Sequence, residues 1–454
     1  MAVSLTKVYF GIWDWVDQGI YAPGTNHVLY GGDFGDKPNL KAFCLNGVVF
    51  SDRSVSAKYQ EVKHVYAPVW ITQKGDEIWV KNHHSHLSLE GFSCQYQVTK
   101  NGAVGQEGEL KMSSVQPGDS ARLCSLHDFK TYKNTDSRLN LSVISQQGVE
   151  VGREQIALSD DLYEAGRKLA ADAMKRYKSS RRLATLSTAE LLARNFSVIP
   201  QFFRAPTDND KSFGNWIAKD WKKSHLDSTL SAIPLKDGEY VYHYGEDGAS
   251  DKAGSSASAK SGGNIRLRLE VAPQQDGFVD VKATYSFEGN LPELPRLGLM
   301  MKLPRVAYDQ VKWYGRGPWE NYPDRKQSCP IGWYESSVEN QFTHYPRPQD
   351  NGNHEDCSYI ELTNKNGKNA LQVIAAGNTP LSFSALPYSV ADLYAARHDF
   401  ELKQSGNPNL RYTCLSLDCA VLGLGNSSCG PGVLKKYSID KTKTYTLHFK
   451  MRIL

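Results

Sequence analysis

The sequence predicts a mostly β protein in which a short helical segment separates two β-rich regions. Short alternating strands with turn residues between them fill roughly residues 63–157 and 200–454. One amphipathic stretch, between Ser159 and Phe196, interrupts them. The first sixty residues are rich in Trp, Gly, Asp and Asn and show little helical periodicity. A chain of 454 residues has room for about three domains.

The chain begins with a predicted strand and a long loop. Residues Phe10–Val16 are mostly apolar, which is typical of a short strand buried in a parallel sheet. The following loop is punctuated by Gly24, Gly31, Gly32, Gly35 and Pro38. Loops of this length in a compact domain are usually functional. We therefore expect the loop to carry part of a site.

The next hundred residues predict an immunoglobulin-like β-sandwich over residues 61–157. Apolar and polar residues alternate in Glu77–Lys81, Phe92–Val98 and Leu139–Val143. Asn101 and Gly102 form a dipeptide that favours a tight hairpin turn. Several short strands with such turns are typical of this sandwich class.

Residues 158–199 are predicted to be helical. Apolar residues recur at steps of three and four at Leu162, Ala165, Leu169, Ala173 and Tyr177. A capping-box pattern from Ser187 to Glu190 predicts a second helix.

Residues 200–454 predict a large antiparallel β-sandwich. Strands are expected at Arg266–Val271, Val279–Tyr285 and Tyr445–Met451, where apolar and polar residues alternate. Residues Gly245–Gly263 are rich in Gly, Ser, Ala and Lys, and we expect a flexible surface loop there.

Charge and cysteine content narrow the possible partners and compartment. The 53 basic and 49 acidic residues give a net charge of +4, which provides no reason to expect nucleic acid as a partner. No apolar run approaches the ~18 residues of a membrane span. The N-terminus does not resemble a signal peptide, and the eight cysteines form no regular framework. We expect free thiols and a cytoplasmic location.

Two early motifs could bind a ligand. Trp13 and Trp15 flank Asp14 in a segment that could stack on a pyranose ring, although two core tryptophans would give the same pattern. Gly31–Asp36 followed by Phe43–Gly47 could bring oxygen ligands to a hard cation. A turn-rich loop stabilised by Asp side chains is at least as compatible with this second motif.

Other motifs favour structural roles. Arg204–Asp210 and Trp313–Arg325 are interpreted as turns held by charge pairs. His83, His84 and His86 could suggest a metal site, but alternate positions on a sheet surface explain them better. Gly423–Pro431 lacks the lysine and the strand–helix context of a phosphate loop.

Taken together and in order, these motifs resemble the C-terminal half of a family 2 glycoside hydrolase of the β-galactosidase type. The matching segments are Ile12–Gln18, Gly31–Asp36, Phe43–Gly47, Arg204–Asp210, Gly315–Arg325 and Asp350–Asn353. They extend over most of the chain.

The resemblance implies an architecture. Residues 1–60 would be the last strand and loop of a (β/α)8 barrel, and 61–157 the immunoglobulin-like domain. Residues 200–454 would be a large β-sandwich of the type called the β-galactosidase small chain, which resembles galactose mutarotase. Residues 158–199 match nothing in this resemblance and are expected to be an insert, so the opening strands of the large sandwich could be missing.

The resemblance also implies a site. Trp13, Asn46 and Cys429 would contact a galactoside, and the carbonyl of Phe43 with Asn46 would hold sodium. Magnesium is implied by the family, but its site is not identifiable in this chain.

The resemblance does not extend to the catalytic residues. Retaining glycosidases need two carboxylates about 5 Å apart. The family's two glutamates precede the motif at Trp13, and Asp14, Asp17, Asp33 and Asp36 do not match their positions. We therefore expect a β-galactosidase-like chain that is inactive alone. The alternatives are a non-catalytic subunit that complements a barrel-bearing chain, and a carbohydrate-binding sandwich. The expected partners are a galactoside and either such a barrel-bearing chain or further copies in a homo-oligomer.

Overall fold

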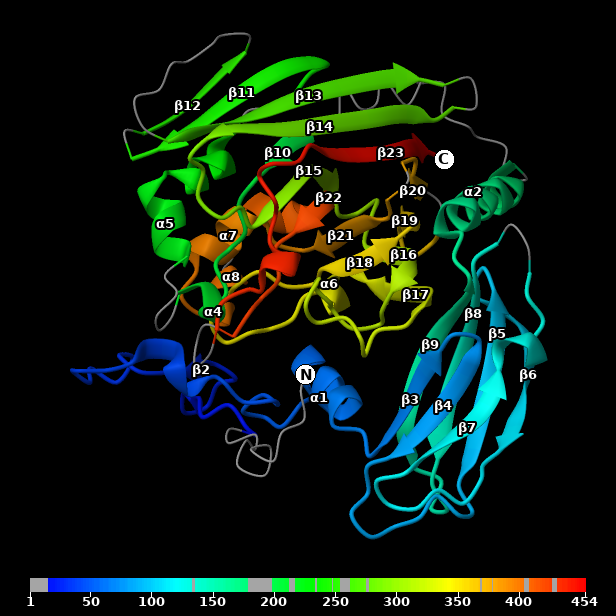
Figure 1. Cartoon of the computed structure of the whole chain (residues 1–454). Helices are drawn as coiled ribbons and strands as arrows, with labels where there is room; N and C mark the ends of the chain where they lie inside the picture. The colour runs from blue at the N-terminus through cyan, green and yellow to red at the C-terminus, as the bar shows by residue number, and fades with distance from the viewer. Residues whose placement is uncertain are drawn as a thin grey trace.

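The computed structural model confirms the mostly β fold class (Figure 1). It describes residues 15–132, 135–178, 198–211, 217–232, 235–246, 248–253, 262–274, 277–367, 370–377, 379–403, 408–426 and 431–454. Among these residues, no helix is long and apolar enough to cross a membrane.

The N-terminal segment has little regular structure, as expected for a long loop. It contains the short hairpin β1 (Ile20–Tyr21) and β2 (Val28–Leu29), the 3-10 turn η2 (Lys41–Cys44) and helix α1 (Ala57–Val65). Val16 and Val49 form an isolated parallel bridge that brings the two ends of the loop together. Figure 1 shows this segment in blue, extending along one side of the molecule.

Two antiparallel sheets form the immunoglobulin-like sandwich. One has the order β3 (Val69–Lys74), β4 (Glu77–Asn82), β7 (Ser120–Ser125). The other has the order β6 (Ala103–Lys111), β5 (Ser93–Lys100), β8 (Ser137–Ile144), β9 (Glu150–Ser159), with η3 (Leu126–Asp128) in the connection after β7. The predicted hairpin turn is present: Asn101 and Gly102 join β5 to β6 with φ of 49° and 79°. Alternate side chains such as Ile78 and Leu139 are fully buried between the sheets.

Helix α2 (Leu162–Lys178) confirms the first predicted helix. Ala165 and Ala170 are buried against Tyr359 and Ile374 of the large sandwich, so the helix covers the outer face of one of its sheets. The second predicted helix, beginning near Ser187, lies outside the described residues.

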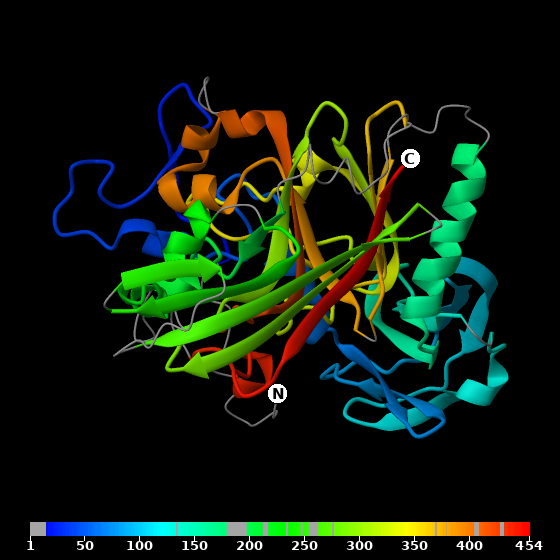
Figure 2. The same ribbon diagram turned by 90° about the horizontal axis from the view of Figure 1, so that it is seen from above.

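The large sandwich consists of a nine-stranded and a five-stranded antiparallel sheet around one core (Figure 2). The larger has the order β12 (Gly248–Ala253), β11 (Gly238–Gly245), β13 (Gly263–Pro273), β14 (Val279–Gly289), β23 (Tyr445–Ile453), β20 (Ala370–Ala375), β19 (Tyr359–Thr363), β16 (Gln310–Arg316), β17 (Ile331–Ser337). The smaller has the order β10 (Val198–Gln201), β15 (Arg296–Pro304), β22 (Tyr412–Val421), β21 (Leu381–Leu386), β18 (His354–Cys357).

Short helices lie around the smaller sheet. They are α4 (Asp208–Lys211), α5 (Ile217–Lys223), η4 (Leu226–Ser231), α6 (Val338–Gln341), α7 (Val390–Ala395), α8 (Asp399–Leu402), η5 (Pro408–Arg411) and η6 (Lys435–Tyr437). The N-cap residues before α6, α7 and α8 are Ser337, Ser389 and His398, and the side chains of the two serines each accept a backbone hydrogen bond.

The predicted loop at Gly245–Gly263 is partly wrong. Residues 248–253 form strand β12, which pairs with β11 across the register Gly245 to Gly248 and Tyr240 to Ala253. The neighbouring strand supplies the hydrogen bonds that local composition does not reveal, and β12 therefore extends the sheet at its edge.

Direct hydrogen bonds join the two sandwiches. The hydroxyl of Tyr314 donates to Asp136 at 2.5 Å, and Trp333 Nε1 donates to the carbonyl of Asn101 at 3.1 Å. Gln155 exchanges two hydrogen bonds with the backbone of Ile331, at 2.8 and 2.9 Å. The immunoglobulin-like domain is therefore docked on the β17 edge of the large sheet.

Candidate functional site

The N-terminal loop is fastened to the large sandwich by a histidine between two carboxylates. His398 Nε2 lies 2.7 Å from Asp33 Oδ2, and its Nδ1 lies 3.1 Å from Glu401 Oε1. The ring of Tyr30 stacks on that of His398 with centroids 4.6 Å apart, and the Tyr30 hydroxyl donates to the Arg397 carbonyl. These contacts determine where the loop lies on the sandwich.

The carboxylates of the loop hold its own turns. Asp33 Oδ2 accepts the Tyr30 N–H at 2.9 Å, and Asp36 Oδ1 accepts the Gly32 N–H at 2.8 Å. Burial, the largest single influence, would raise the pKa of Asp33, but the hydrogen bonds from the Tyr30 N–H and from His398, together with the electrostatic attraction of His398 and Arg397, lower it. The structure therefore gives the carboxylates of Asp33 and Asp36 a turn-forming role, one of the two readings left open above.

Phe43 and Asn46 lie close together at the end of the loop. Phe43 is half-buried on η2, and Asn46 follows on an exposed turn. The turn is held on both sides, since Gln18 N–H donates to the Cys44 carbonyl at 2.9 Å and Gly47 N–H donates to Asp17 Oδ1 at 2.7 Å. Trp13 and Cys429, the other predicted substrate contacts, lie outside the described residues.

The donor chemistry at this turn is suited to sodium. The Phe43 carbonyl and the Asn46 side-chain amide both offer neutral oxygen, the ligand type that hard cations take. Among the described residues, no group of three or more His, Cys, Asp or Glu side chains is arranged to hold a metal ion. We therefore assign no magnesium site to side chains of the described residues.

Below the turn lies a buried polar layer. Burial raises the pKa of Asp17, against the opposing attraction of Lys58. Burial also lowers the pKa of Lys58, which faces Asp17, Asp208 and Glu320. The Asp17 carboxylate accepts the Gly47 N–H and is attracted electrostatically by Lys58, and a Cβ on Gly47 would stand 2.2 Å from Asp17 N.

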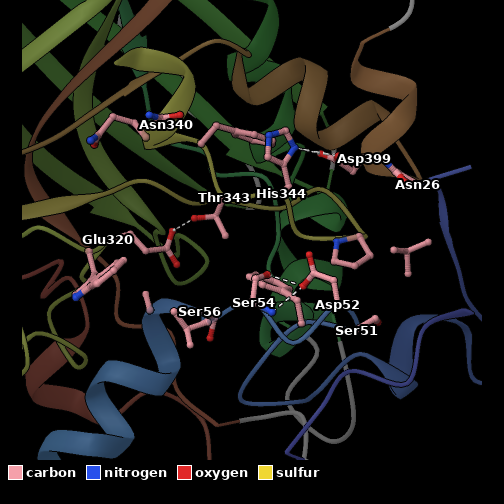
Figure 3. A pocket seen from close by; sticks show the side chains of 18 of the residues that line it. Asn26, Ser51, Asp52, Ser54, Ser56, Glu320, Asn340, Thr343, His344 and Asp399 are labelled. Carbon is pink, nitrogen blue, oxygen red and sulfur yellow. Dashed lines mark hydrogen bonds and ion pairs between the residues drawn. The ribbon is translucent and has the colours of Figure 1, made fainter. Parts of the chain in front are cut away.

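A cavity of about 790 Å³ lies between part of the N-terminal loop and the large sandwich (Figure 3). Asp52 and Ser54 lie on the loop side, and His344 and Asp399 lie on the sandwich side, with His344 Nδ1 within 3.0 Å of the Asp399 carboxylate. Neither Phe43 nor Asn46 is among the lining residues. The sequence analysis missed this cavity because its walls come from segments about three hundred residues apart in the chain, and no local signal marks them.

Three other features predicted from the sequence are the charge-paired turn at Arg204, the histidine motif and the cysteines. Arg204 forms a buried bidentate pair with Asp210, at 2.8 and 3.0 Å, as interpreted from the sequence. The histidine motif is not on a strand: β4 ends at Asn82, and His83 and His84 follow it, so the expected alternate strand positions are wrong. The seven described cysteines are free thiols.

Comparison with known proteins gives two family matches. The model for the β-galactosidase small chain matches residues 175–451, and the model for the glycosyl hydrolase family 2 TIM-barrel domain matches residues 6–71. The first match begins at 175, so part of the region that was expected to match nothing lies inside the family. The expectation for residues 175–199 was therefore wrong.

Curated relatives are named β-galactosidases. Those of Priestia megaterium and Lactobacillus delbrueckii subsp. bulgaricus are 28% and 29% identical, each over 98% of this chain and 44% of its own length. The chain thus spans less than half the length of these relatives. A solved exo-chitosanase from Amycolatopsis orientalis aligns with 64% of this chain and 25% of its own, at 12% identity and a TM-score of 0.21, which is too weak to support an argument.

The small-chain match covers more than half of the residues, in the same order as the motifs read from the sequence. Together with the barrel match before it, this identifies the chain as a member of the β-galactosidase small-chain family, corresponding to a C-terminal part of family 2 β-galactosidases.

Proposed function

We propose that this chain provides the galactoside-contacting, non-catalytic part of a β-galactosidase, an enzyme that hydrolyses terminal β-D-galactosides with retention. The observation that carries the proposal is the attachment of the N-terminal loop to the large sandwich through Asp33 and His398 at 2.7 Å. This attachment fixes the Gly31–Asp36 turn on the sandwich, and the Gly31 N–H donates to the Lys41 carbonyl at 3.2 Å, which links that turn to η2, the segment just before Asn46.

The proposed substrate contacts are Trp13, Asn46 and Cys429. The Phe43 carbonyl and the Asn46 amide oxygen would hold sodium, whose positive charge attracts a sugar hydroxyl oxygen. The exposed side chain of Asn46 favours this role, because it can reach both an ion and a sugar.

The two catalytic carboxylates are proposed to come from other parts of a (β/α)8 barrel, whose family model matches residues 6–71. Asp17, Asp33 and Asp36 each accept a backbone hydrogen bond within the loop, which suits them poorly to act as nucleophile or acid. Loss of an essential nucleophile costs on the order of 10⁶ in rate. The 454 residues are accordingly proposed to be inactive on their own.

Exposed apolar side chains in the N-terminal segment support the proposal that the rest of a barrel covers this segment. Trp15, Ile20, Phe34 and Leu40 are between 54% and 66% exposed, and all lie in the N-terminal segment. A contiguous apolar patch of this kind usually marks an interaction surface, and we propose that these side chains contribute to one. The covering barrel could be supplied by the same polypeptide or by a second chain.

The test is hydrolysis of a chromogenic β-galactoside with sodium and magnesium present. The purified 454-residue chain is expected to be inactive, and addition of a barrel-bearing fragment of a relative is expected to restore turnover. Turnover by the chain alone would contradict the proposal. Saturable galactoside binding with no restored turnover would instead favour a carbohydrate-binding protein.

A further inference from the structure

The carboxylate of Asp324 holds the segment that follows strand β22. Its Oδ1 accepts the Leu424 N–H at 2.9 Å, and its Oδ2 accepts the Gly425 N–H at 2.8 Å. Two successive backbone N–H groups that converge on one anion form the concave arrangement called a nest. In the described part of the chain, these two amides are the only hydrogen-bond partners of the Asp324 side chain. Asp324 therefore fixes the segment at two consecutive residues.

The contact between Asp324 and this segment is close and strong. A Cβ on Gly423 would stand 2.7 Å from Asp324 Cγ, which is closer than nonbonded atoms pack. Only a glycine at position 423 therefore lets the carboxylate reach the two amides without a shift. Hydrogen bonds from backbone N–H groups to an ionised carboxylate are roughly twice as strong as those between neutral groups.

Arg204 holds the same segment by its carbonyl groups. Its guanidinium donates to the carbonyls of Leu422 and Gly423, at 2.8 and 3.2 Å. Arg204 is fully buried, so its replacement would disturb the core, whereas Asp324 is only half-buried. Replacement of Asp324 is therefore the milder way to release the segment.

The segment held by Asp324 leads directly to Cys429, one of the galactoside contacts proposed above. The carbonyl of Gly425 accepts a hydrogen bond from Asn209 Nδ2 at 2.8 Å. The Asn426 N–H donates to the Pro431 carbonyl at 3.0 Å, which joins the residues on either side of positions 427–430. A residue that contacts a substrate must be held in one place by the residues around it. Asp324 binds the chain just before this short stretch.

From these contacts we propose that Asp324 is a positioning residue for galactoside binding, because it holds the segment that carries Cys429. The inference rests on the proposed function, in which Cys429 contacts the sugar. Asp324 acts through the backbone of Leu424 and Gly425 and not on the substrate itself. Its loss should therefore weaken substrate binding and leave the chemical step nearly intact.

Steady-state hydrolysis of a chromogenic β-galactoside by the 454-residue chain, mixed with a barrel-bearing fragment of a relative, tests the effect on binding. Asp324→Asn keeps the size of the side chain but removes its charge and one acceptor oxygen. It should raise KM about tenfold and leave kcat within about twofold, as expected when ground-state binding is lost. Gly423→Ala leaves the carboxylate in the chain but displaces it, and should raise KM in the same direction.

The matched control is Asp392→Asn. The Asp392 carboxylate also accepts a backbone N–H, from Ser389 at 2.8 Å, but it does so in the capping box of α7. Its replacement should leave KM and kcat at the parent values. Thermal unfolding establishes that each variant is folded before its kinetics are compared.

Hydrogen exchange in the 454-residue chain alone provides a second measurement that needs no turnover. The amides of Leu424 and Gly425 should exchange about tenfold faster in Asp324→Asn than in the parent, because local opening becomes easier. The same amides should exchange equally in Asp392→Asn and in the parent.

The possible outcomes separate this inference from the proposed function. Unchanged exchange at Leu424 and Gly425 in Asp324→Asn would overturn the inference. Faster exchange with an unchanged KM in an active mixture would overturn it as well, because the segment would then have no part in binding the galactoside. A parent mixture without turnover would contradict the proposed function and, with it, the role of Asp324 in galactoside binding.

Discussion

His398 Nε2 lies 2.7 Å from Asp33 Oδ2, although the two residues are 365 positions apart in the chain. Both side chains are about nine-tenths buried. Because Asp33 also accepts the Tyr30 N–H, one carboxylate both closes the glycine-rich turn and attaches it to the sandwich. The position of the glycine-rich turn at Gly31–Asp36 thus depends on a residue near the other end of the protein.

Replacement of Asp33 by asparagine should loosen the loop without unfolding the protein. The substitution keeps the shape but removes the charge that pairs with His398, and a charge-assisted hydrogen bond of this kind contributes about 1–3 kcal/mol. Limited proteolysis should cleave the Asp33→Asn loop faster than that of the parent. Asp36→Asn is the control, since Asp36 bonds only within the loop. Equal cleavage of the Asp33→Asn variant and the parent would contradict the role given to His398.

The same attachment should weaken in acid. The pKa values of Asp33 and Glu401 are lowered in the folded protein, since hydrogen bonds from backbone and from His398 outweigh burial, the largest opposing influence. Groups with lowered pKa stabilise the fold above their unfolded-state values, about 4, and lose that contribution as the pH falls through the folded values. The proteolysis difference between the parent and Asp33→Asn should therefore be full at neutral pH, begin to shrink as the pH falls below about 4, and vanish only at a lower pH, below the folded-state pKa values. A difference that persists in strong acid would contradict this account.

Replacement by alanine should destabilise the protein more at Gly102, the hairpin glycine at the domain junction, than at Gly148, a turn glycine elsewhere. Gly102 and Gly148 have φ of 79° and 75°, so alanine strains both backbones by about 1 kcal/mol. A Cβ at Gly102 would also stand 2.6 Å from Trp333 Cδ1 and 2.7 Å from Tyr314 Cε2, whereas one at Gly148 meets nothing within 4 Å. Gly102→Ala should therefore lose about 1–3 kcal/mol more in urea unfolding than Gly148→Ala. Equal losses would contradict close packing at this junction.

The buried pair of Arg204 and Asp210 should contribute far more to the free energy of unfolding than an exposed pair of the same geometry. Arg204→Met leaves the carboxylate of Asp210 buried without its cation, which costs about 3–5 kcal/mol. Arg266→Met removes an equally bidentate bond to Glu288, but both side chains are about half exposed, so the loss should stay below about 1 kcal/mol. Urea unfolding of the two variants measures the difference. Similar losses would contradict a structural role for the buried pair.

Local features of the sequence predicted those parts of the fold that local physics determines. Asn101 and Gly102 form the expected hairpin because both adopt positive φ, a property of the residues themselves. Helix α2 follows from the spacing of Leu162, Ala165 and Leu169, whose apolar face packs on the large sheet. Strand β12 was missed because its pairing comes from β11 and not from its own small polar residues.

Contacts between distant segments could not be read from the sequence. Nothing in the local sequence around Asp33 or His398 indicates that the two residues meet. The residues that line the cavity are likewise far apart in the chain, from Tyr21 to Phe400. Phe43 and Asn46 were found only through the resemblance, since a turn-rich loop explained their pattern equally well. The motifs located the candidate site along the chain, but tertiary packing determines its geometry.

The measurement that tests the central claim most directly is hydrolysis of a chromogenic β-galactoside by the 454-residue chain, with and without a barrel-bearing fragment of a relative. We predict no turnover by the chain alone, and turnover with the fragment that falls when Asn46→Ala replaces the parent chain. Turnover by the purified chain alone, at the same rate with or without the fragment, would contradict the claim that its catalytic carboxylates come from elsewhere.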